Sequence, residues 1–171
     1  QQLSGKVQVH RDGAPALVKP LQWQAIAFPE FGVMDIWTVG HPEAVTLPRT
    51  VPGVRFCANV MTGSDEKTFD GLKVLQGLVD SHILSLREAA RELEASGRSQ
   101  APKKIVRPRP ALFGWASGTR EGRPAITAAW LRSMPAGGMG GATSVPLALA
   151  LQAFADDRTR LSAGVLTPEE A

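Results

Sequence analysis

The sequence predicts an α+β fold, with a mixed, largely antiparallel sheet and helices packed on one face. Short segments of alternating polarity, separated by turn residues, occupy residues 1–60 and predict strands. Apolar side chains recur every three or four positions over residues 64–97 and predict helix. A second pair of strand-like segments follows in residues 111–133. Strands and helices grouped in this way are typical of α+β domains.

Four strands are predicted in the first 60 residues, at 6–10, 22–28, 33–39 and 54–60. Asp12 and Gly13 form a turn signal after the first strand. The third strand is mostly apolar, which is expected of a strand covered on both faces. Pro48 and Pro52 make residues 46–53 a connection rather than a regular element.

One continuous apolar stripe defines the helical region, made of Phe69, Leu72, Leu75, Val79, His82, Ile83, Leu86, Ala90 and Leu93. The region is either a single long helix or two helices broken near Gly77 or Ser81. His82 lies on this stripe, so we expect a buried, hydrogen-bonded histidine rather than a ligand.

The second half of the chain begins with a polar, proline-bearing loop at residues 98–110. A hairpin follows, in which the polar turn at residues 120–123 joins strands at 111–119 and 124–133. Residues 135–142 read PAGGMGGA and form a glycine-rich crossing. The last helix is expected to begin at Thr143 or Ser144 as its N-cap and to end near residue 156.

Composition bounds the possible classes of protein. A length of 171 residues predicts one domain over 1–171. Cys57 is the single cysteine, which excludes an intrachain disulfide and a cysteine-cluster zinc site. We expect Cys57 to be a small, half-buried residue of a strand. The three histidines share no metal-ligand spacing, so no metal is expected. No apolar run approaches the roughly 18 residues of a membrane span, and no export signal is visible, which predicts a cytoplasmic protein without membrane contact.

The net charge of +3 is a mild excess and gives no strong indication of a nucleic-acid partner. The densest basic stretch, residues 103–109, is interleaved with prolines. We therefore interpret it as a solvated linker or strand entrance, with a polyanion-binding module as a weaker reading.

Two features of the sequence could carry chemistry. The glycines from Gly137 to Gly141 lack the spacing of a P-loop and of the Rossmann Gly-x-Gly-x-x-Gly, so they are a strand-to-helix crossing or one edge of a site completed elsewhere. His41, with Glu43 and Arg49 nearby, is the best polar candidate, because ligand contacts favour loops. The alternative is a turn fixed by Pro42 with solvated side chains.

Several short motifs together resemble the C-terminal domain of saccharopine dehydrogenase-like oxidoreductases. The first two are residues 27–32, which read AFPEFG, and residues 40–49, which read GHPEAVTLPR. Residues 142–148 (ATSVPLA) resemble the family's helix start, although Ser144 stands where the family often has glycine. Residues 163–169 (AGVLTPE) resemble its ending, and Gly118, Gly122 and Arg123 fit its strand pair.

The resemblance implies a substrate-binding and dimerisation domain whose NAD- or NADP-binding Rossmann domain, N-terminal in the parent protein, is absent from this chain. The first residue is Gln1 rather than Met, which fits a domain excised from a longer chain. The implied partners are that Rossmann domain, a second copy in a homodimer and a small-molecule substrate. Hydride chemistry belongs to the cofactor, so this chain alone is expected to bind no cofactor and to be inactive.

The resemblance also suggests site residues, while the catalytic residue and the substrate stay unknown. His41, Arg49 and Arg123 are the candidates for substrate contacts, since arginine binds carboxylates in a bidentate manner. Gly140, Gly141 and Thr143 are the candidates for the cofactor cleft. A non-enzymatic oligomerisation or interaction domain is the alternative function.

Overall fold

The computed structural model describes residues 2–63, 66–99 and 110–156. Residues 1–27 with 33–106 form one compact unit, called unit 1, and residues 28–32 with 107–171 form another, called unit 2. The described residues contain four helices and three small antiparallel sheets, which confirms the α+β class, and they show no Rossmann-type pattern. The strands thus divide among three sheets rather than lying in one. The organisation as a single domain stays a prediction.

The first sheet of unit 1 is the hairpin of β1 (Val7–Arg11) and β2 (Ala14–Val18), which pair antiparallel with Val7 opposite Val18. The alternation that predicts β1 is confirmed by its burial, since Val7 and Val9 both face the interior. The second half of this hairpin was not among the strands predicted from the sequence.

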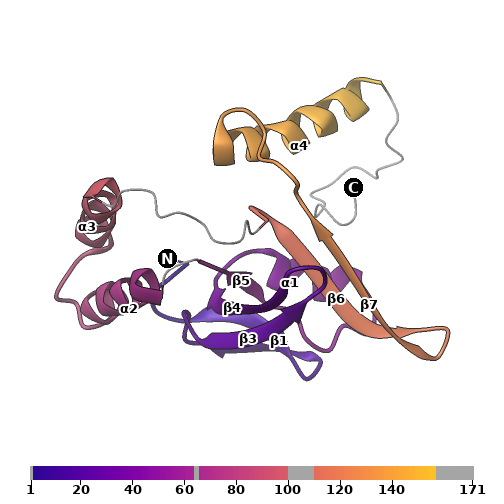
Figure 1. Ribbon diagram of the computed structural model, residues 1–171, viewed down its shortest axis with the longest axis horizontal. Coiled ribbons are helices and arrows are strands. Elements are labelled where there is room, and N and C mark those ends of the chain that lie inside the picture. Colours follow the sequence, from indigo (N-terminus) through magenta and orange to yellow (C-terminus); the bar gives the residue numbers. More distant parts are fainter. Residues whose placement is uncertain (1, 64–65, 100–109, 157–171) are drawn as a thin grey trace. The chain divides into compact units, whose positions relative to one another are not determined.

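The second sheet has the strand order β3-β4-β5, formed by β3 (Trp23–Phe28), β4 (Gly32–Val39) and β5 (Asn59–Met61). β4 and β5 are antiparallel, with Trp37 opposite Met61. The predicted apolar third strand corresponds to β4, which is central in this sheet and mostly buried or half-buried. Figure 1 shows these strands in the purple part of the chain.

Residues 54–60 form no single strand, so that prediction is only partly correct. Cys57 and His10 exchange backbone hydrogen bonds of 2.8 and 2.9 Å in an isolated bridge, and the Arg55 carbonyl accepts the N–H of Gly13 at 3.0 Å. Further along, the same segment pairs with β4 as β5. It therefore changes partner between two sheets, which interrupts its regular pairing.

Helix α1 (Glu43–Thr50) includes residues 46–50 of the predicted connection 46–53, so that prediction is wrong for the helical part and holds for residues 51–53. The Pro42 carbonyl accepts the N–H of Thr46 at 3.0 Å and so closes the first turn. Pro48 lies inside the helix. A proline there removes only the one bond that its N–H would make to the carbonyl of Ala44, and the remaining turns tolerate the loss.

The long helical region consists of two helices, α2 (Glu66–Asp80) and α3 (Leu86–Ser99). Of the two predicted alternatives, a single helix or two, the second is confirmed. Helix α2 ends at Asp80, so the break lies at Ser81, one of the two predicted positions. His82 lies in the connection with φ of +58° and is exposed, so its predicted burial is wrong. The chain turns there in a left-handed conformation, and this removes His82 from the helical stripe.

The core of unit 1 forms where α2 packs on the sheet. The buried cluster consists of Leu21, Trp37, Phe69 and Leu72. The apolar stripe continues into α3 in the sequence, but Leu86 and Leu93 are 47% and 41% exposed. Only the α2 part of the stripe is therefore buried.

A capping box begins α3. The backbone N–H and hydroxyl of Ser85 both donate to the Glu88 carboxylate at 2.7 Å, and the Glu88 N–H donates back to the Ser85 hydroxyl at 3.2 Å. These bonds hold the pKa of Glu88 below its usual value. The reciprocal bonds explain why this exposed helix starts where it does.

Unit 2 contains the predicted hairpin, formed by β6 (Phe113–Arg120) and β7 (Arg123–Trp130) (Figure 1). The strands pair antiparallel over their full length. Glu121 and Gly122 form the two-residue turn with φ of +54° and +74°. Two positive φ angles define the type I′ turn that suits hairpin twist, and glycine adopts the second without strain. The predicted hairpin is confirmed.

Aromatic rings form the core of unit 2. Phe28 contacts Phe113 edge-on with a centroid distance of 5.0 Å, and Phe31 contacts Trp130 in the same manner at 5.5 Å. Edge-to-face pairs are favourable because the positive ring edge meets the negative ring face. Phe28 is 2% exposed as a result.

The last described helix, α4 (Gly138–Ala155), begins five residues before Thr143, so the predicted start is wrong. The N–H of Gly141 already donates to the Gly137 carbonyl at 3.4 Å. The glycine segment therefore closes the first turn of the helix instead of forming a loop. Ser144, a predicted N-cap, donates its hydroxyl to the Gly141 carbonyl from inside the helix at 3.1 Å. The basic stretch 103–109 and the ending at 163–169 lie outside the described residues.

Candidate functional site

The candidate site is built around the connection from β4 to α1. Nδ1 of His41 contacts Oε2 of Glu43, the first residue of α1. The same carboxylate oxygen accepts a hydrogen bond from the side-chain amide of Asn59 at 3.0 Å. The Asn59 carbonyl oxygen in turn accepts the backbone N–H of Ala44 at 3.1 Å. Asn59, from β5, thus holds both the carboxylate and one open N–H of the first helical turn.

This chain of contacts orients the His41 ring. Because Nδ1 is engaged by Glu43, Nε2 is the ring nitrogen left for another partner. The side chains of His41 and Glu43 are 47% and 44% exposed, so a ligand can reach them. The arrangement can bind a hydroxyl, carbonyl or carboxylate group and can exchange a proton with it.

Opposing effects act on the Glu43 carboxyl. Partial burial raises its pKa, whereas hydrogen bonds from His41, from its own backbone N–H and from Asn59, together with the charge of His41, lower it. The net result is a pKa below the usual value. The carboxylate therefore stays ionised and keeps accepting from His41.

Glu43→Gln should destabilise the protein at neutral pH and do so less in acid. Because the pKa of Glu43 is lower in the folded state, its contribution is complete above its unfolded pKa of about 4.3 and is lost as pH falls through the folded pKa. Urea unfolding of both proteins at about pH 7 and about pH 3.5 measures this difference. The matched control is Glu92→Gln on exposed α3. An effect of Glu43→Gln that is equal at both pH values would contradict the assignment.

The structure does not gather the predicted substrate residues into one cluster. Arg49 is exposed in the last turn of α1, whereas His41 precedes its first turn. An eight-residue helix is about 12 Å long, so the two side chains start from opposite ends. Arg123 begins β7 in unit 2 and faces Arg120 across the hairpin. This pairing places a second basic residue, Arg120, beside Arg123 at the end of the hairpin, and sequence reasoning missed it.

The predicted cofactor residues lie in the first turns of α4. A Cβ added to Gly141 would meet the Ala136 carbonyl oxygen at 2.0 Å, whereas one added to Gly140 meets nothing within 4 Å. Thr143 is exposed within the helix. Gly141 thus has a steric role in the helix start, and cofactor contacts at these three residues stay a prediction.

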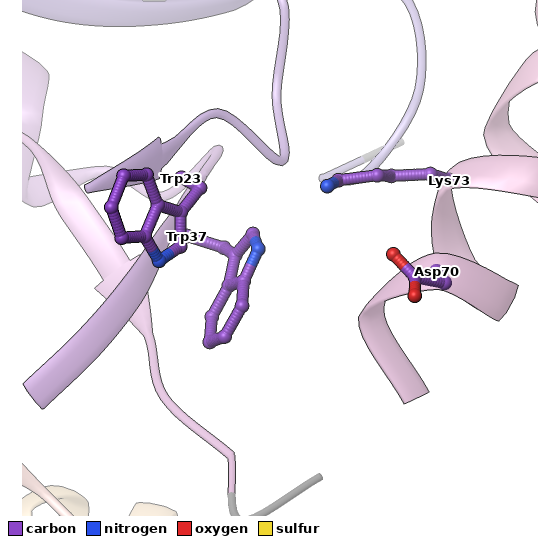
Figure 2. A pocket seen from close by; sticks show the side chains of 4 residues that line it. All are labelled: Trp23, Trp37, Asp70 and Lys73. Atoms are coloured by element: carbon purple, nitrogen blue, oxygen red, sulfur yellow. The ribbon is translucent and has the colours of Figure 1, made fainter. Parts of the chain in front are cut away.

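A pocket in unit 1 was missed by the sequence reasoning. Its volume is about 200 Å³, and Trp23, Trp37, Asp70 and Lys73 line it (Figure 2). The indoles come from β3 and β4 and the charged groups from α2. The spacing of Asp70 and Lys73 on one helix face was a visible signal. Nothing local in the sequence connects that face with two strands more than 30 residues away.

Over the part of the chain that the structure describes, no group of three or more His, Cys, Asp or Glu side chains could hold a metal ion. Within the same residues, no helix combines the length and the apolar character that crossing a membrane requires. Comparison of the chain with protein-family models, with curated proteins and with solved structures found no significant match.

Proposed function

We propose that this chain is the substrate-binding and dimerisation domain of a saccharopine dehydrogenase-like oxidoreductase, in which a separate Rossmann domain binds NAD or NADP. The proposal comes from the motifs in residues 27–32, 40–49 and 142–148. In it, this chain contributes substrate contacts and the cofactor contributes the hydride.

The observation that carries the proposal is the His41–Glu43–Asn59 arrangement. The motif at residues 40–49 contains two of its three members, and the third comes from β5. A histidine whose orientation is fixed by a carboxylate, on an exposed connection beside a sheet, suits contact with a polar substrate. Arg49 and Arg123 are the additional candidates for an acidic substrate group.

Titration calorimetry with NADH and NADPH tests whether the nucleotide site belongs to the Rossmann domain rather than to this chain. Because the Rossmann domain supplies the nucleotide site in this proposal, the chain alone should show no binding and no dehydrogenase activity. Micromolar binding of either nucleotide to this chain would contradict it.

In the parent enzyme, His41→Asn should raise KM several-fold, because the imidazole contact with substrate is lost. The matched control is His82→Asn, since His82 is also exposed in unit 1 and asparagine tolerates its positive φ. Steady-state kinetics gives the KM of both variants. An unchanged KM for His41→Asn would remove His41 from the substrate site.

A non-enzymatic oligomerisation domain is the second candidate, and α4 favours it. Val145, Leu147, Leu149 and Leu151 are 46–65% exposed, and the helix contains no charged residue. A helix that is apolar all round is usually buried. Sedimentation velocity should therefore detect a dimer, and Leu147→Glu combined with Leu149→Glu should dissociate it. A strictly monomeric chain would contradict both this candidate and the dimerisation part of the first.

A further inference from the structure

The hairpin of unit 2 directs its backbone groups inward and outward by turns. In a hairpin with a two-residue turn, the residues that flank the turn, here Arg120 and Arg123, form a hydrogen-bonded pair. Every second residue repeats this inward pairing, and the bond from the N–H of Leu131 to the carbonyl of Leu112 at 2.9 Å continues it beyond the strands. The residues in between therefore direct their N–H and carbonyl groups to the outer edges of the hairpin.

The two outer edges differ. The outward-directed residues of β6 are Phe113, Trp115, Ser117 and Thr119. On the outer edge of β7, Pro124 takes one of the corresponding positions and has no N–H to donate. Proteins commonly protect exposed sheet edges with prolines and charged residues, but β6 contains neither before Arg120 at its end. Within the described residues, no backbone hydrogen bond joins the outer edge of β6 to another element.

Two glycines distinguish β6 from an ordinary strand. A Cβ added to Gly114 or Gly118 meets nothing within 4 Å, so packing within the described residues does not require glycine at either position. Neither residue has a positive φ, so the backbone conformation does not require glycine either. Glycine inside a strand weakens it and often marks a place where another backbone approaches closely. Ala116 lies between the two glycines on the same face of the strand.

The edge of β6 is complementary to itself. When two copies are paired antiparallel with Ala116 opposite Ala116, Phe113 faces Thr119 of the second copy and Trp115 faces its Ser117. Each of these residues then gives both its N–H and its carbonyl to the other strand, so every outward-directed group of the two strands has a partner. An interface between identical copies about a two-fold axis requires such self-complementarity.

The side chains fit the same register. Gly114 faces Gly118 of the second copy, and the two Ala116 residues meet at the axis. These are non-hydrogen-bonded pairs, in which the Cα atoms of antiparallel strands approach to about 4.5 Å and the side chains are closest. The two Arg120 residues lie eight positions apart along the paired strands, or about 27 Å at 3.4 Å per residue. Their charges are therefore screened from each other.

We infer that the outer edge of β6 is the contact between two copies of this chain, paired antiparallel about a two-fold axis at Ala116 into a four-stranded sheet. A hairpin of two strands is marginally stable by itself, whereas a sheet of three or more strands with an apolar face is not. The inference rests on the dimerisation in the proposed function and names the surface that produces it. A dimer that persists when this edge is blocked would overturn the inference alone, whereas a strictly monomeric chain would also contradict the proposed dimerisation.

Sedimentation velocity of two proline variants tests the edge. Ser117→Pro removes an outward-directed N–H and no hydrogen bond within the hairpin, as Pro124 already does in β7. Two bonds per dimer are lost, so the dissociation constant should rise about thirtyfold. The matched control is Ala128→Pro, which removes an outward-directed N–H from the opposite edge and should leave association unchanged. Circular dichroism confirms that both variants fold. Unchanged association in Ser117→Pro, or an equal loss in both variants, would contradict a contact through β6.

Charged residues at the axis test the register. Ala116→Glu places two carboxylates opposite each other and Ala116→Lys places two ammonium groups there, so each variant alone should associate more weakly. An equimolar mixture should associate about fivefold more tightly than either variant, because opposite charges then meet. The matched control is the same exchange at Thr127, which pairs with Ala116 inside the hairpin but lies on β7. No gain on mixing the Ala116 variants, or an equal gain with the Thr127 variants, would exclude an axis at Ala116.

Discussion

Trp37→Ala should lower the free energy of unfolding by about 3–5 kcal/mol, the range for deleting a large aromatic side chain from a core. Trp37 is 3% exposed and belongs to the buried cluster with Leu21, Phe69 and Leu72. Its ring lies parallel to that of Phe69, with a centroid distance of 3.5 Å and an angle of 7°. Parallel face-to-face stacking is not the preferred aromatic geometry, so most of the loss comes from apolar burial and the cavity left behind.

Urea unfolding followed by circular dichroism measures this loss, and Trp23→Ala is the matched control. Trp23 is the same residue type in the neighbouring strand, but it is 60% exposed. Its replacement should cost about 1 kcal/mol or less, through lost strand propensity and the bond to Asp35. A loss below about 1 kcal/mol for Trp37→Ala would mean that α2 does not pack on the sheet through this residue.

The elements that the sequence predicts correctly depend on local signals. The β6–β7 hairpin follows from a glycine turn between two segments rich in branched and aromatic residues, and both requirements lie within about 20 residues. The division into α2 and α3 was one of two alternatives that the sequence left open, with a break near Gly77 or Ser81. The Ser85–Glu88 capping box that begins α3 was not predicted, although it too is a local signal. The signals that predict these elements therefore lie within the elements themselves.

The elements that were missed depend on distant partners. α1 forms in a proline-bearing segment, where Asn59 from another strand binds its first turn. Residues 54–60 change partner between His10 in β1 and the edge of β4. His82 lies on the helical repeat in the sequence, but the chain leaves the helix just before it. Sequence periodicity describes one element and carries no information about such partners.

In the candidate site, too, contacts between residues close in the sequence could be predicted, whereas contacts with distant residues could not. His41 and Glu43 are two residues apart, so their association could be predicted from the sequence. Asn59 lies 16 residues beyond Glu43, and no motif indicates that it completes the arrangement. Arg49 is close to His41 in the sequence but lies at the far end of α1, because the intervening residues are helical rather than a loop. Proximity in sequence predicts proximity in space only when the local structure is known.

Gly141→Ala and Gly140→Ala should have opposite effects on α4, although the two residues are adjacent. At Gly140 the new methyl group meets nothing within 4 Å, so alanine should stabilise the helix by about 1 kcal/mol through its higher propensity. At Gly141 the methyl group would lie 2.0 Å from the Ala136 carbonyl oxygen and 3.1 Å from its carbon. Backbone atoms cannot move aside without disrupting the turn. The first turn of α4 should therefore open, which lowers the stability of the helix by about 1–3 kcal/mol.

Amide hydrogen exchange within α4 measures both effects, because the helix can open locally without unfolding of the whole chain. Protection of the amides of Leu147 and Leu149 should rise in Gly140→Ala and fall in Gly141→Ala. In Gly141→Ala the helix should begin near Thr143, the start that the sequence predicts when the glycines are taken as a loop. The close approach of Gly141 to the Ala136 carbonyl leaves no room for a side chain there, so an equal change in both variants would show that the first turn does not close against that carbonyl.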